Sequence, residues 1–294
     1  MILGAIVTYN PDYDILNFNL KKLDEQVDHI LIVNNGVKIN LDVINQNVQL
    51  NIIENEENVG IAKALNIALD YAFINNYEYI LTMDQDSYLK DGYVEVLLNH
   101  FNKNEKVGIV GPNIIEKELG ENKLSNVTET RPVSHVITSG SLNLVQALKD
   151  AGGFDNKLFI DMVDLDISYR VIDAGYQVIQ TSDLTLEHRI GAPVVRKFLF
   201  KKHIVRHHAP FRKYFFVRNR LYIAFKYRKR GFKFIFIHLV GILYFTFLVI
   251  IFEKQKLKKL RLILAGIIDF LRGNYNNKII NTKGVQNENT CDRC

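Results

Sequence analysis

Two aspartates one residue apart, Asp84 and Asp86, come directly after the apolar run Tyr79–Met83 and are followed by Ser87. A short apolar run rich in Ile, Leu and Tyr predicts a buried strand, and ligands in open α/β sheets bind beyond the carboxyl ends of such strands. Mg²⁺ is usually held by one or two protein carboxylates, while water and phosphate oxygens complete its coordination. The pair therefore fits a metal-bound diphosphate, although aspartates in a surface turn more often only form the turn.

A second acidic group consists of Asp161, Asp164 and Asp166, just before a predicted short helix that ends at Gly175. Aspartates commonly cap a helix and complement the positive charge of its N-terminus. Three carboxylates exceed what capping needs, so one of them is a candidate general base. We expect the crowded like charges to raise the pKa of Asp164 above its ordinary value of about 3.9, which would improve it as a base near neutral pH.

The segments that must position these carboxylates alternate between strands and helices. Strands are predicted at 2–8, 30–33, 50–53 and 79–83, and a helix after Gly60 carries one apolar face formed by Ile61, Ala64, Leu65, Ala68, Leu69 and Ala72. This order predicts an α/β fold with a doubly wound, mostly parallel sheet, helices on both faces and polar residues at the strand ends. The sequence contains neither a Gly-x-Gly-x-x-Gly after its first strand nor a Walker-type Gly-Lys-Ser/Thr. These absences argue against a dinucleotide oxidoreductase and a P-loop enzyme and leave a nucleotide-sugar enzyme.

Short motifs along the chain make the prediction more specific. They are Val7-Thr8-Tyr9-Asn10-Pro11, Val33-Asn34-Asn35-Gly36, Asn58-Val59-Gly60-Ile61-Ala62, Asp84-Gln85-Asp86-Ser87, Thr138-Ser139-Gly140-Ser141, Phe159-Ile160-Asp161-Met162-Val163-Asp164-Leu165-Asp166 with Arg170, and Arg218-Asn219. Through these motifs roughly residues 1–275 resemble the family 2 glycosyltransferases, which have the GT-A fold. The resemblance is closest to the rhamnosyltransferase-like group that builds bacterial cell-surface polysaccharides.

The resemblance implies an inverting transfer of a sugar from a nucleoside-diphosphate donor to a lipid-linked glycan of an O-antigen, capsule or cell wall. It favours L-rhamnose from dTDP-L-rhamnose, while glucose or galactose from a UDP-sugar stays an alternative. It aligns Asp164 with the second position of the group's Glu/Asp-Asp motif and so implies that Asp164 is the catalytic base. Asp84 and Asp86 would bind Mg²⁺ or Mn²⁺ and assist departure of the diphosphate.

Two positions depart from the pattern of the family. Asn34 stands where many relatives carry an Asp that contacts the nucleotide base, although an amide can still form hydrogen bonds with a pyrimidine edge. Val163 replaces the acid that usually precedes the catalytic residue. Both substitutions bear on residues that the resemblance assigns to the site.

Further residues are expected around the donor and the acceptor. The predicted nucleotide-sugar-binding residues are Thr8, Tyr9, Asn10, Asn34, Asn58, Asp84, Gln85 and Asp86. On the acceptor or sugar side we expect Ser139, Gly140, Asp161, Asp166, His188 and Arg218. His188 would also assist Asp84 and Asp86 with the metal, because neutral imidazole is a good ligand. A Ser-Gly turn, a single His and a single Arg also have ordinary structural explanations.

Two other classes of function are weaker alternatives. Glycosidases also use paired carboxylates, but a hydrolase does not need a metal–diphosphate site. A non-catalytic membrane scaffold of a polysaccharide assembly complex could keep the fold with a degenerate site. The presence of Asp84, Asp86 and Asp164 argues against the scaffold.

Positive charge is concentrated in one region of the chain. Residues 188–252 contain no Asp or Glu, while residues 189–233 contain 15 Lys and Arg, so a chain of net charge +5 carries −10 elsewhere (5 − 15 = −10). Aromatic residues are interleaved with these cations, a mixture typical of contact with anionic lipid headgroups. Nucleic acid is the rival partner, since basic and aromatic surfaces also bind bases and phosphates. The apolar segment that follows favours lipid over nucleic acid.

Residues 234–252 are almost wholly apolar and long enough to cross a bilayer as a helix. Both flanks are basic, so charge gives no clear orientation, and insertion as a hairpin or in the membrane plane fits better. The next segment shows the pattern of an interfacial helix, with Leu257, Leu260, Ile263, Leu264, Ile267, Ile268 and Leu271 on one face. Both segments could alternatively be core helices or the interface of a homo-oligomer.

These observations predict three parts: a catalytic domain at 1–230, membrane-associated helices at 231–275 and a polar tail at 276–294 that is expected to be disordered. The Cys291-Asp-Arg-Cys294 sequence in this tail is weak evidence for zinc. A basic n-region and a long apolar h-region are both missing at the N-terminus, so no signal peptide is expected. We therefore expect a catalytic domain at the cytoplasmic face of the cell membrane.

Overall fold

The computed structural model describes residues 1–45, 48–102, 106–115, 128–187, 193–206 and 209–276. The chain divides into two compact units. The N-terminal unit comprises Met1–Asn156 and Val163–Arg189, and the C-terminal unit comprises Lys157–Met162 and Ile190–Cys294. The predicted boundary at residue 230 was based on composition and resemblance, whereas these units are based on spatial proximity, so the extent of the catalytic domain stays a prediction.

The N-terminal unit is built on one mixed sheet. Its strands are β1 (Ile2–Thr8), β2 (His29–Asn34), β3 (Leu50–Glu54), β4 (Tyr79–Asp84), β5 (Val107–Ile115), β6 (Arg131–Pro132), β7 (Ser141–Leu144) and β8 (Gln177–Glu187). They lie in the order β3-β2-β1-β4-β7-β5-β8-β6. Strands β1 to β4 are mutually parallel where they pair, β8 runs parallel to β5, and β7 is antiparallel to β4 and β5. The predicted doubly wound, mostly parallel sheet is confirmed.

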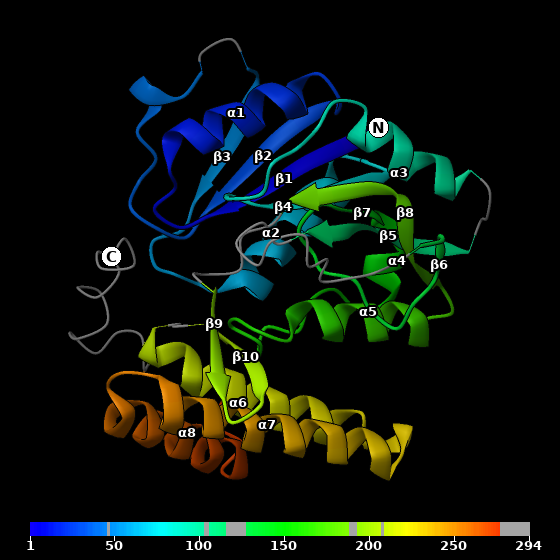
Figure 1. Cartoon of the computed structure of the whole chain (residues 1–294). Helices are drawn as coiled ribbons and strands as arrows, with labels where there is room; N and C mark the ends of the chain where they lie inside the picture. The colour runs from blue at the N-terminus through cyan, green and yellow to red at the C-terminus, as the bar shows by residue number, and fades with distance from the viewer. Residues whose placement is uncertain (46–47, 103–105, 116–127, 188–192, 207–208, 277–294) are drawn as a thin grey trace. The chain divides into compact units, whose positions relative to one another are not determined.

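Helices cover both faces of this sheet, as Figure 1 shows. They are α1 (Tyr13–Asp24), α2 (Ile61–Ile74), α3 (Tyr93–Phe101), α4 (Val145–Asp150) and α5 (Val163–Asp173), with a 3₁₀ turn η1 (Leu41–Val43). Helices α1 and α3 lie on one face, and α2, α4 and α5 lie on the other (Figure 1). The apolar stripe predicted for α2 is buried from Ala64 to Ala72, and only Ile61 at its first position is half-buried.

Helix α5 begins earlier than the sequence predicted. It was expected at 167–175, but it starts at Val163 and ends at Asp173. The two preceding residues, Asp161 and Met162, both have positive φ, at 66° and 68°, a conformation that a helix does not contain. Asp164 and Asp166 therefore lie in the first turn of the helix rather than before it.

The C-terminal unit combines a hairpin with helices. The hairpin consists of β9 (Pro193–Phe198) and β10 (Lys201–Arg206), and it is followed by α6 (Pro210–Lys226), the 3₁₀ turn η3 (Arg228–Arg230), α7 (Phe232–Phe252) and α8 (Lys256–Leu271). Helix α6 packs against both α7 and α8 (Figure 1). Buried apolar side chains from the helices form its core: Val217, Leu221, Ile242, Val249 and Ile263.

Helix α7 passes the length and composition test for a membrane span among the residues that the structure describes. It has 21 residues and a mean hydropathy of 2.7, and 22% of its most apolar stretch is buried. A core helix of a soluble protein can pass the same test, but it would be mostly buried. The predicted apolar segment is thus a single, largely uncovered helix.

Candidate functional site

The carboxyl ends of four neighbouring strands place polar residues in one row. In the pairing register Thr8 at the end of β1 lies opposite Asn34 at the end of β2, and Asn34 lies opposite Glu54 at the end of β3. On the other side of β1, Val7 pairs with Asp84 at the end of β4. Since these strands are parallel, the row lies along one edge of the sheet, where open α/β folds bind ligands. The sequence predicted every member of this row except Glu54.

Asn34 is fully buried and its side chain is held from several directions. Its Oδ1 accepts hydrogen bonds from Thr8 Oγ1 at 3.0 Å and Gly36 N at 3.1 Å. Its Nδ2 donates to Val37 O at 2.8 Å and to Glu54 Oε2 at 2.6 Å. This is the full capacity of an amide, so Asn34 organises the ends of β1, β2 and β3. The amide that was considered for base recognition is thus already engaged within the protein.

The ends of β1 and β4 are joined by a side-chain amide. Gln85 Oε1 accepts a hydrogen bond from Tyr9 N at 2.7 Å, and Gln85 Nε2 donates to Tyr9 O at 3.1 Å. Asn10, with φ of 49°, accepts a hydrogen bond from Val37 N at 3.0 Å through Oδ1. Tyr9 is 36% exposed and Asn10 is exposed, so both can reach a ligand at this edge.

Ser139 connects the acidic turn, which we define as Asp84–Ser87, to the neighbouring Thr138–Ser141 turn. Its Oγ accepts a hydrogen bond from Asp84 N at 3.0 Å and lies 2.8 Å from Ser87 Oγ. Both serines are buried, while Asp84 and Asp86 are half-buried. The acidic turn is therefore anchored by buried serines, while Asp84 and Asp86 remain partly exposed to solvent.

Gly140 occupies a position that admits only glycine. Its φ is +73°, and a Cβ there would overlap the Tyr93 hydroxyl and lie 2.6 Å from Leu186 Cδ2. Its N–H donates to Thr82 O at 2.7 Å, and its carbonyl accepts from Tyr93 Oη at 2.8 Å. Burial raises the pKa of Tyr93 well above its ordinary value, which keeps this phenol protonated as a donor. Gly140 thus sets the backbone next to Ser139.

Asn58 shapes the approach to α2. Its Oδ1 accepts a hydrogen bond from Gly60 N at 3.0 Å, and Gly60, with φ of 83°, precedes the first residue of the helix. Backbone N–H groups at a helix N-terminus favour anions. The side chain predicted to contact the nucleotide therefore forms the turn before this helix.

The acidic residues of α5 have different environments. Asp164 is half-buried, and its Oδ1 accepts a hydrogen bond from Leu165 N at 2.9 Å. Asp166 is fully buried, and its Oδ2 lies 4.0 Å from Arg170 Nη1, which also donates to Gly153 O at 2.6 Å. Asp164 alone of the two is accessible to solvent, as a base that meets a substrate hydroxyl must be.

Asp161 and Arg218 belong to the C-terminal unit and are described there. Asp161 Oδ1 lies 2.8 Å from Arg212 Nη2 in an ion pair. Arg218 is fully buried and donates to Lys157 O at 3.0 Å and to Asn219 Oδ1 at 3.0 Å. Asn219 Nδ2 donates to Ile160 O at 2.7 Å. Helix α6 therefore holds residues 157–161, the segment that leads along the chain to Asp164.

Among the described residues, the predicted metal ligands are the carboxylates of Asp84 and Asp86. Within the described ranges no cluster of three or more His, Cys, Asp and Glu could enclose a metal ion. Two accessible carboxylates on an anchored turn instead fit a cation that keeps water and phosphate oxygens as its other ligands. His188, the third predicted ligand, lies outside the described residues.

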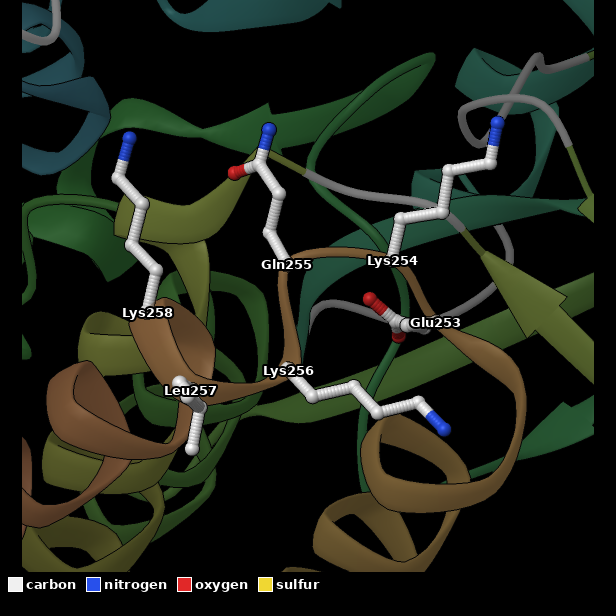
Figure 2. Close-up of a pocket in the computed structure, with 6 residues that line it drawn as sticks. All are labelled: Glu253, Lys254, Gln255, Lys256, Leu257 and Lys258. Atoms are coloured by element: carbon white, nitrogen blue, oxygen red, sulfur yellow. The ribbon is translucent and has the colours of Figure 1, made fainter.

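A pocket lies in the C-terminal unit. Figure 2 shows its lining residues, which comprise the turn after α7 and the first residues of α8: Glu253, Lys254, Gln255, Lys256, Leu257 and Lys258. None of the predicted site residues lines this pocket. Glu253 is buried. Its Oε1 lies 2.6 Å from Lys213 Nζ, and its Oε2 lies 2.7 Å from Lys259 Nζ. The turn is thus a charged structural junction between helices.

Several residues that shape the site were missed in the sequence. Ser87 stood in a recognised motif but was assigned no role, although its pairing with Ser139 anchors the acidic turn. Glu54 ends a strand like Asn34 and Asp84, and that position was an available signal. Asn219 stood in a recognised motif but was assigned no role, and Arg212 carries no local signal, because its partner Asp161 lies 51 residues away along the chain.

Comparisons with known proteins bear on the family and the fold of this chain. Residues 5–148 match the sequence model of Glycosyl transferase family 2. The dTDP-rhamnosyl transferase RfbF of Shigella flexneri is 29% identical over 92% of this chain and 96% of its own length. The structure of S. aureus TarS residues 1–349 in complex with UDP-GlcNAc matches with a TM-score of 0.62 at 16% identity, over 92% of this chain and 80% of that chain.

A third relative is the mannosyltransferase PcManGT from Pyrobaculum calidifontis in complex with GDP-Man and Mn²⁺. It matches with a TM-score of 0.55 at 14% identity, over 92% of this chain and 75% of that chain. These two structures support the fold, which is the predicted GT-A type. The strand-end row, the acidic turn after β4 and the first turn of α5 lie within this fold.

Proposed function

Because this chain is a rhamnosyltransferase-like member of glycosyl transferase family 2, we propose that it transfers L-rhamnose from dTDP-L-rhamnose to a lipid-linked glycan. The observation that carries the proposal is the acidic turn at the end of β4, which Ser139 and Gln85 anchor beside the ends of β1 and β2. The similarity to a dTDP-rhamnosyl transferase over nearly the whole chain supports the choice of sugar.

Donor binding is assigned to the strand-end row. Asp84 and Asp86 would hold a divalent cation, Mg²⁺ or Mn²⁺, which neutralises negative charge on the departing diphosphate when it is bound. Related folds that bind a nucleotide sugar with Mn²⁺ support this assignment. We assign base contacts to Tyr9 and Asn10, because they are exposed whereas Asn34 is buried and fully engaged. His188 stays a predicted ligand of the diphosphate or the metal.

Asp164 is assigned as the general base. An acceptor hydroxyl oxygen attacks the anomeric carbon, its proton passes to the Asp164 carboxylate, and the bond between the anomeric carbon and the diphosphate oxygen breaks with inversion. The half-buried position of Asp164 in the first turn of α5 supports this role. Asp166 and Arg218 are fully buried, so we assign them to support of the fold rather than to contact with sugar hydroxyls.

The acceptor is proposed to be a glycan on a polyprenyl diphosphate at the cytoplasmic leaflet. The regional positive charge of residues 189–233 supports this, because it would attract both anionic lipid and the diphosphate of the acceptor. A UDP-glucose or UDP-galactose donor is the alternative, since the residues in the row do not distinguish these sugars.

A donor screen tests the proposal. The purified full chain is heated with dTDP-rhamnose, UDP-glucose, UDP-galactose, UDP-N-acetylglucosamine and GDP-mannose, each with Mn²⁺ and with EDTA. A ligand that binds the native state raises the unfolding temperature. We expect dTDP-rhamnose to give the largest shift and EDTA to remove it. A larger Mn²⁺-dependent shift with a UDP-sugar would replace the donor, and no shift with any donor would contradict the assigned site.

A further inference from the structure

One face of helix α7 exposes large apolar side chains. Leu243 is 70% exposed and Phe232 is 80% exposed. The side chains that this helix buries are His238, Ile242, Leu248 and Val249, and its Thr246 hydroxyl donates back to Ile242 O within the helix. The remaining exposed apolar residues recur at helical spacing and form one face: Phe236, Ile237, Leu239, Val240, Tyr244, Ile250 and Ile251. A water-facing helix has the opposite arrangement, so this face marks an interaction surface.

The hairpin of the same unit continues this surface. Its turn exposes Leu199 by 81% and Phe200 completely. The hairpin is docked on α7, because the rings of Phe198 and Phe247 lie 5.5 Å apart and His203 Nδ1 lies 2.9 Å from Tyr244 Oη. Helix α8 adds its own exposed stripe of Leu257, Leu264, Ile268 and Leu271.

The charge around these apolar residues selects the partner. Residues 188–252 contain no acid, and 15 Lys and Arg lie within 189–233. Lys254, Lys256 and Lys258 add positive charge at the turn after α7 (Figure 2). Exposed cations lie in the hairpin, at Arg196, Lys197, Lys201 and Lys202, and just before α7, at Arg228, Lys229 and Arg230. An apolar face among such cations fits a leaflet of anionic lipid. A second copy of the chain would bring cations against cations, which disfavours a dimer through this face.

A cation of α6 that contacts the middle of α7 decides how α7 can lie. Arg220 Nε donates to His238 O at 3.0 Å. A Cβ on Gly241 would overlap the Arg220 guanidinium, so the two groups are in close contact. Gly241 lies near the centre of the 21-residue helix, and an upright α7 would therefore bring this guanidinium to the bilayer centre, where a charge is costly.

Helix α7 cannot leave its neighbours without breaking contacts along its length. The rings of Phe216 and Phe245 stack at 4.0 Å, and Glu253 after α7 is paired with Lys213 of α6 and Lys259 of α8. Helix α6 would have to accompany α7 across the membrane. The cations of α6 make its passage through the membrane unfavourable: Arg212, Lys213, Arg218, Arg220 and Lys226.

We propose that α7 lies flat in the headgroup region of an anionic membrane with its apolar face toward the lipid, and does not cross the bilayer. The hairpin tip at Leu199 and Phe200 would insert beside it. This inference rests on the membrane association in the proposed function, but it is independent of the sugar that is transferred.

Vesicle flotation tests the surface. The full chain is floated with phosphatidylcholine vesicles that contain or lack phosphatidylglycerol. We expect binding to the anionic vesicles, weakening with salt, and an about tenfold lower partition coefficient for Leu243→Ser. Ile74→Ser is the matched control, because Ile74 is 74% exposed at the end of α2. Absence of binding, equal loss in both variants, or a dimer that Leu243→Ser dissociates would overturn the proposal.

Cysteine labelling tests the orientation. Cys291 and Cys294, the two cysteines of the chain, are replaced by Ser. Single cysteines are then introduced before and after α7 as Lys229→Cys and Lys254→Cys, both at exposed positions. In inside-out vesicles from bacteria that express the full chain, a membrane-impermeant maleimide should label both sites equally without detergent. Labelling of one site alone would mean that α7 spans the bilayer. The donor screen contains no vesicles, so either test can fail without the other.

Discussion

The Ser139 hydroxyl accepts a hydrogen bond from the Asp84 backbone N–H at 3.0 Å, so a turn after β4 and a turn before β7 are coupled through one buried atom. Ser139→Ala would leave this buried N–H without its acceptor and cost about 1–3 kcal/mol of unfolding free energy. It should also weaken donor binding, because the acidic turn loses an anchor.

Urea denaturation and a donor titration check both effects. Ser134→Ala is the control, since Ser134 is exposed in the same loop. A Ser139→Ala protein with unchanged stability and unchanged donor affinity would show that the coupling does not support the site.

Gly140 and Gly92 form a matched pair of glycines with positive φ, at +73° and +69°. At Gly92 a Cβ meets nothing within 4 Å, so Gly92→Ala should cost only the backbone strain of about 1–2 kcal/mol. Gly140→Ala adds overlap with Tyr93 and Leu186 and should cost about 2–5 kcal/mol in total. Chemical denaturation of the two variants measures the difference. Equal costs would mean that the space around Gly140 relaxes freely.

Removing a carboxylate of the acidic turn should separate metal-dependent from metal-independent binding. Asp86→Ala is expected to weaken donor affinity in Mn²⁺ by about tenfold or more, because a charged ligand to the cation is lost. In EDTA the variant and the wild type should bind equally weakly. Asp24→Ala, at an exposed position at the end of α1, controls for the loss of one negative charge. Full Mn²⁺-dependent affinity in Asp86→Ala would remove this residue from the metal site.

Stability at high pH should depend on Tyr214 of α6. Burial, followed by the hydrogen bond to Asp269, raises the pKa of Tyr214 to about 12. The folded state therefore holds this proton more tightly than the unfolded chain, whose tyrosines titrate near 10. The stabilisation is complete below pH 10 and declines as the pH rises from 10 toward 12.

The difference in unfolding free energy between wild type and Tyr214→Phe should consequently stay constant below pH 10 and shrink between pH 10 and pH 12. Urea unfolding followed by circular dichroism measures it. Tyr244→Phe is the control, because Tyr244 is 47% exposed. Lysine deprotonation affects the wild type and both variants alike. A difference that stays constant across this range would contradict the assignment.

Local patterns were enough to predict much of this fold. Apolar runs bounded by polar residues identified β1 to β4. The polar residues Thr8, Asn34 and Asp84 end β1, β2 and β4. The start of α5 was missed, because the two positive-φ residues before it leave no trace in periodicity. Local signals are reliable where the chain interacts with near neighbours.

Roles that depend on distant partners could not be read in the same way. The predicted role of Arg218 at the sugar or acceptor side stays a prediction, and nothing in the sequence indicated that its guanidinium lies 4.9 Å from the Phe215 ring and donates to the Lys157 carbonyl. The predicted role of Asn34 at the nucleotide also stays a prediction, and no local pattern indicated that its amide donates to Glu54, 20 residues away. The sequence shows which side chains can make hydrogen bonds, and only tertiary structure shows which partners they find.

Asp164 is the residue on which the proposed chemistry depends. Asp164→Asn preserves an oxygen that can accept the hydrogen bond from Leu165 N, so the fold and donor affinity should be retained. Loss of the base should lower turnover by about 10²- to 10⁴-fold. Asp173→Asn, at an exposed position at the end of the same helix, is the control.

The most direct measurement is the Mn²⁺-dependent release of dTDP from dTDP-L-rhamnose together with the appearance of rhamnose on a polyprenyl-diphosphate-linked glycan. The account predicts both products for wild type and Asp173→Asn, and donor binding without product for Asp164→Asn. Turnover of Asp164→Asn at the wild-type rate would contradict the central claim.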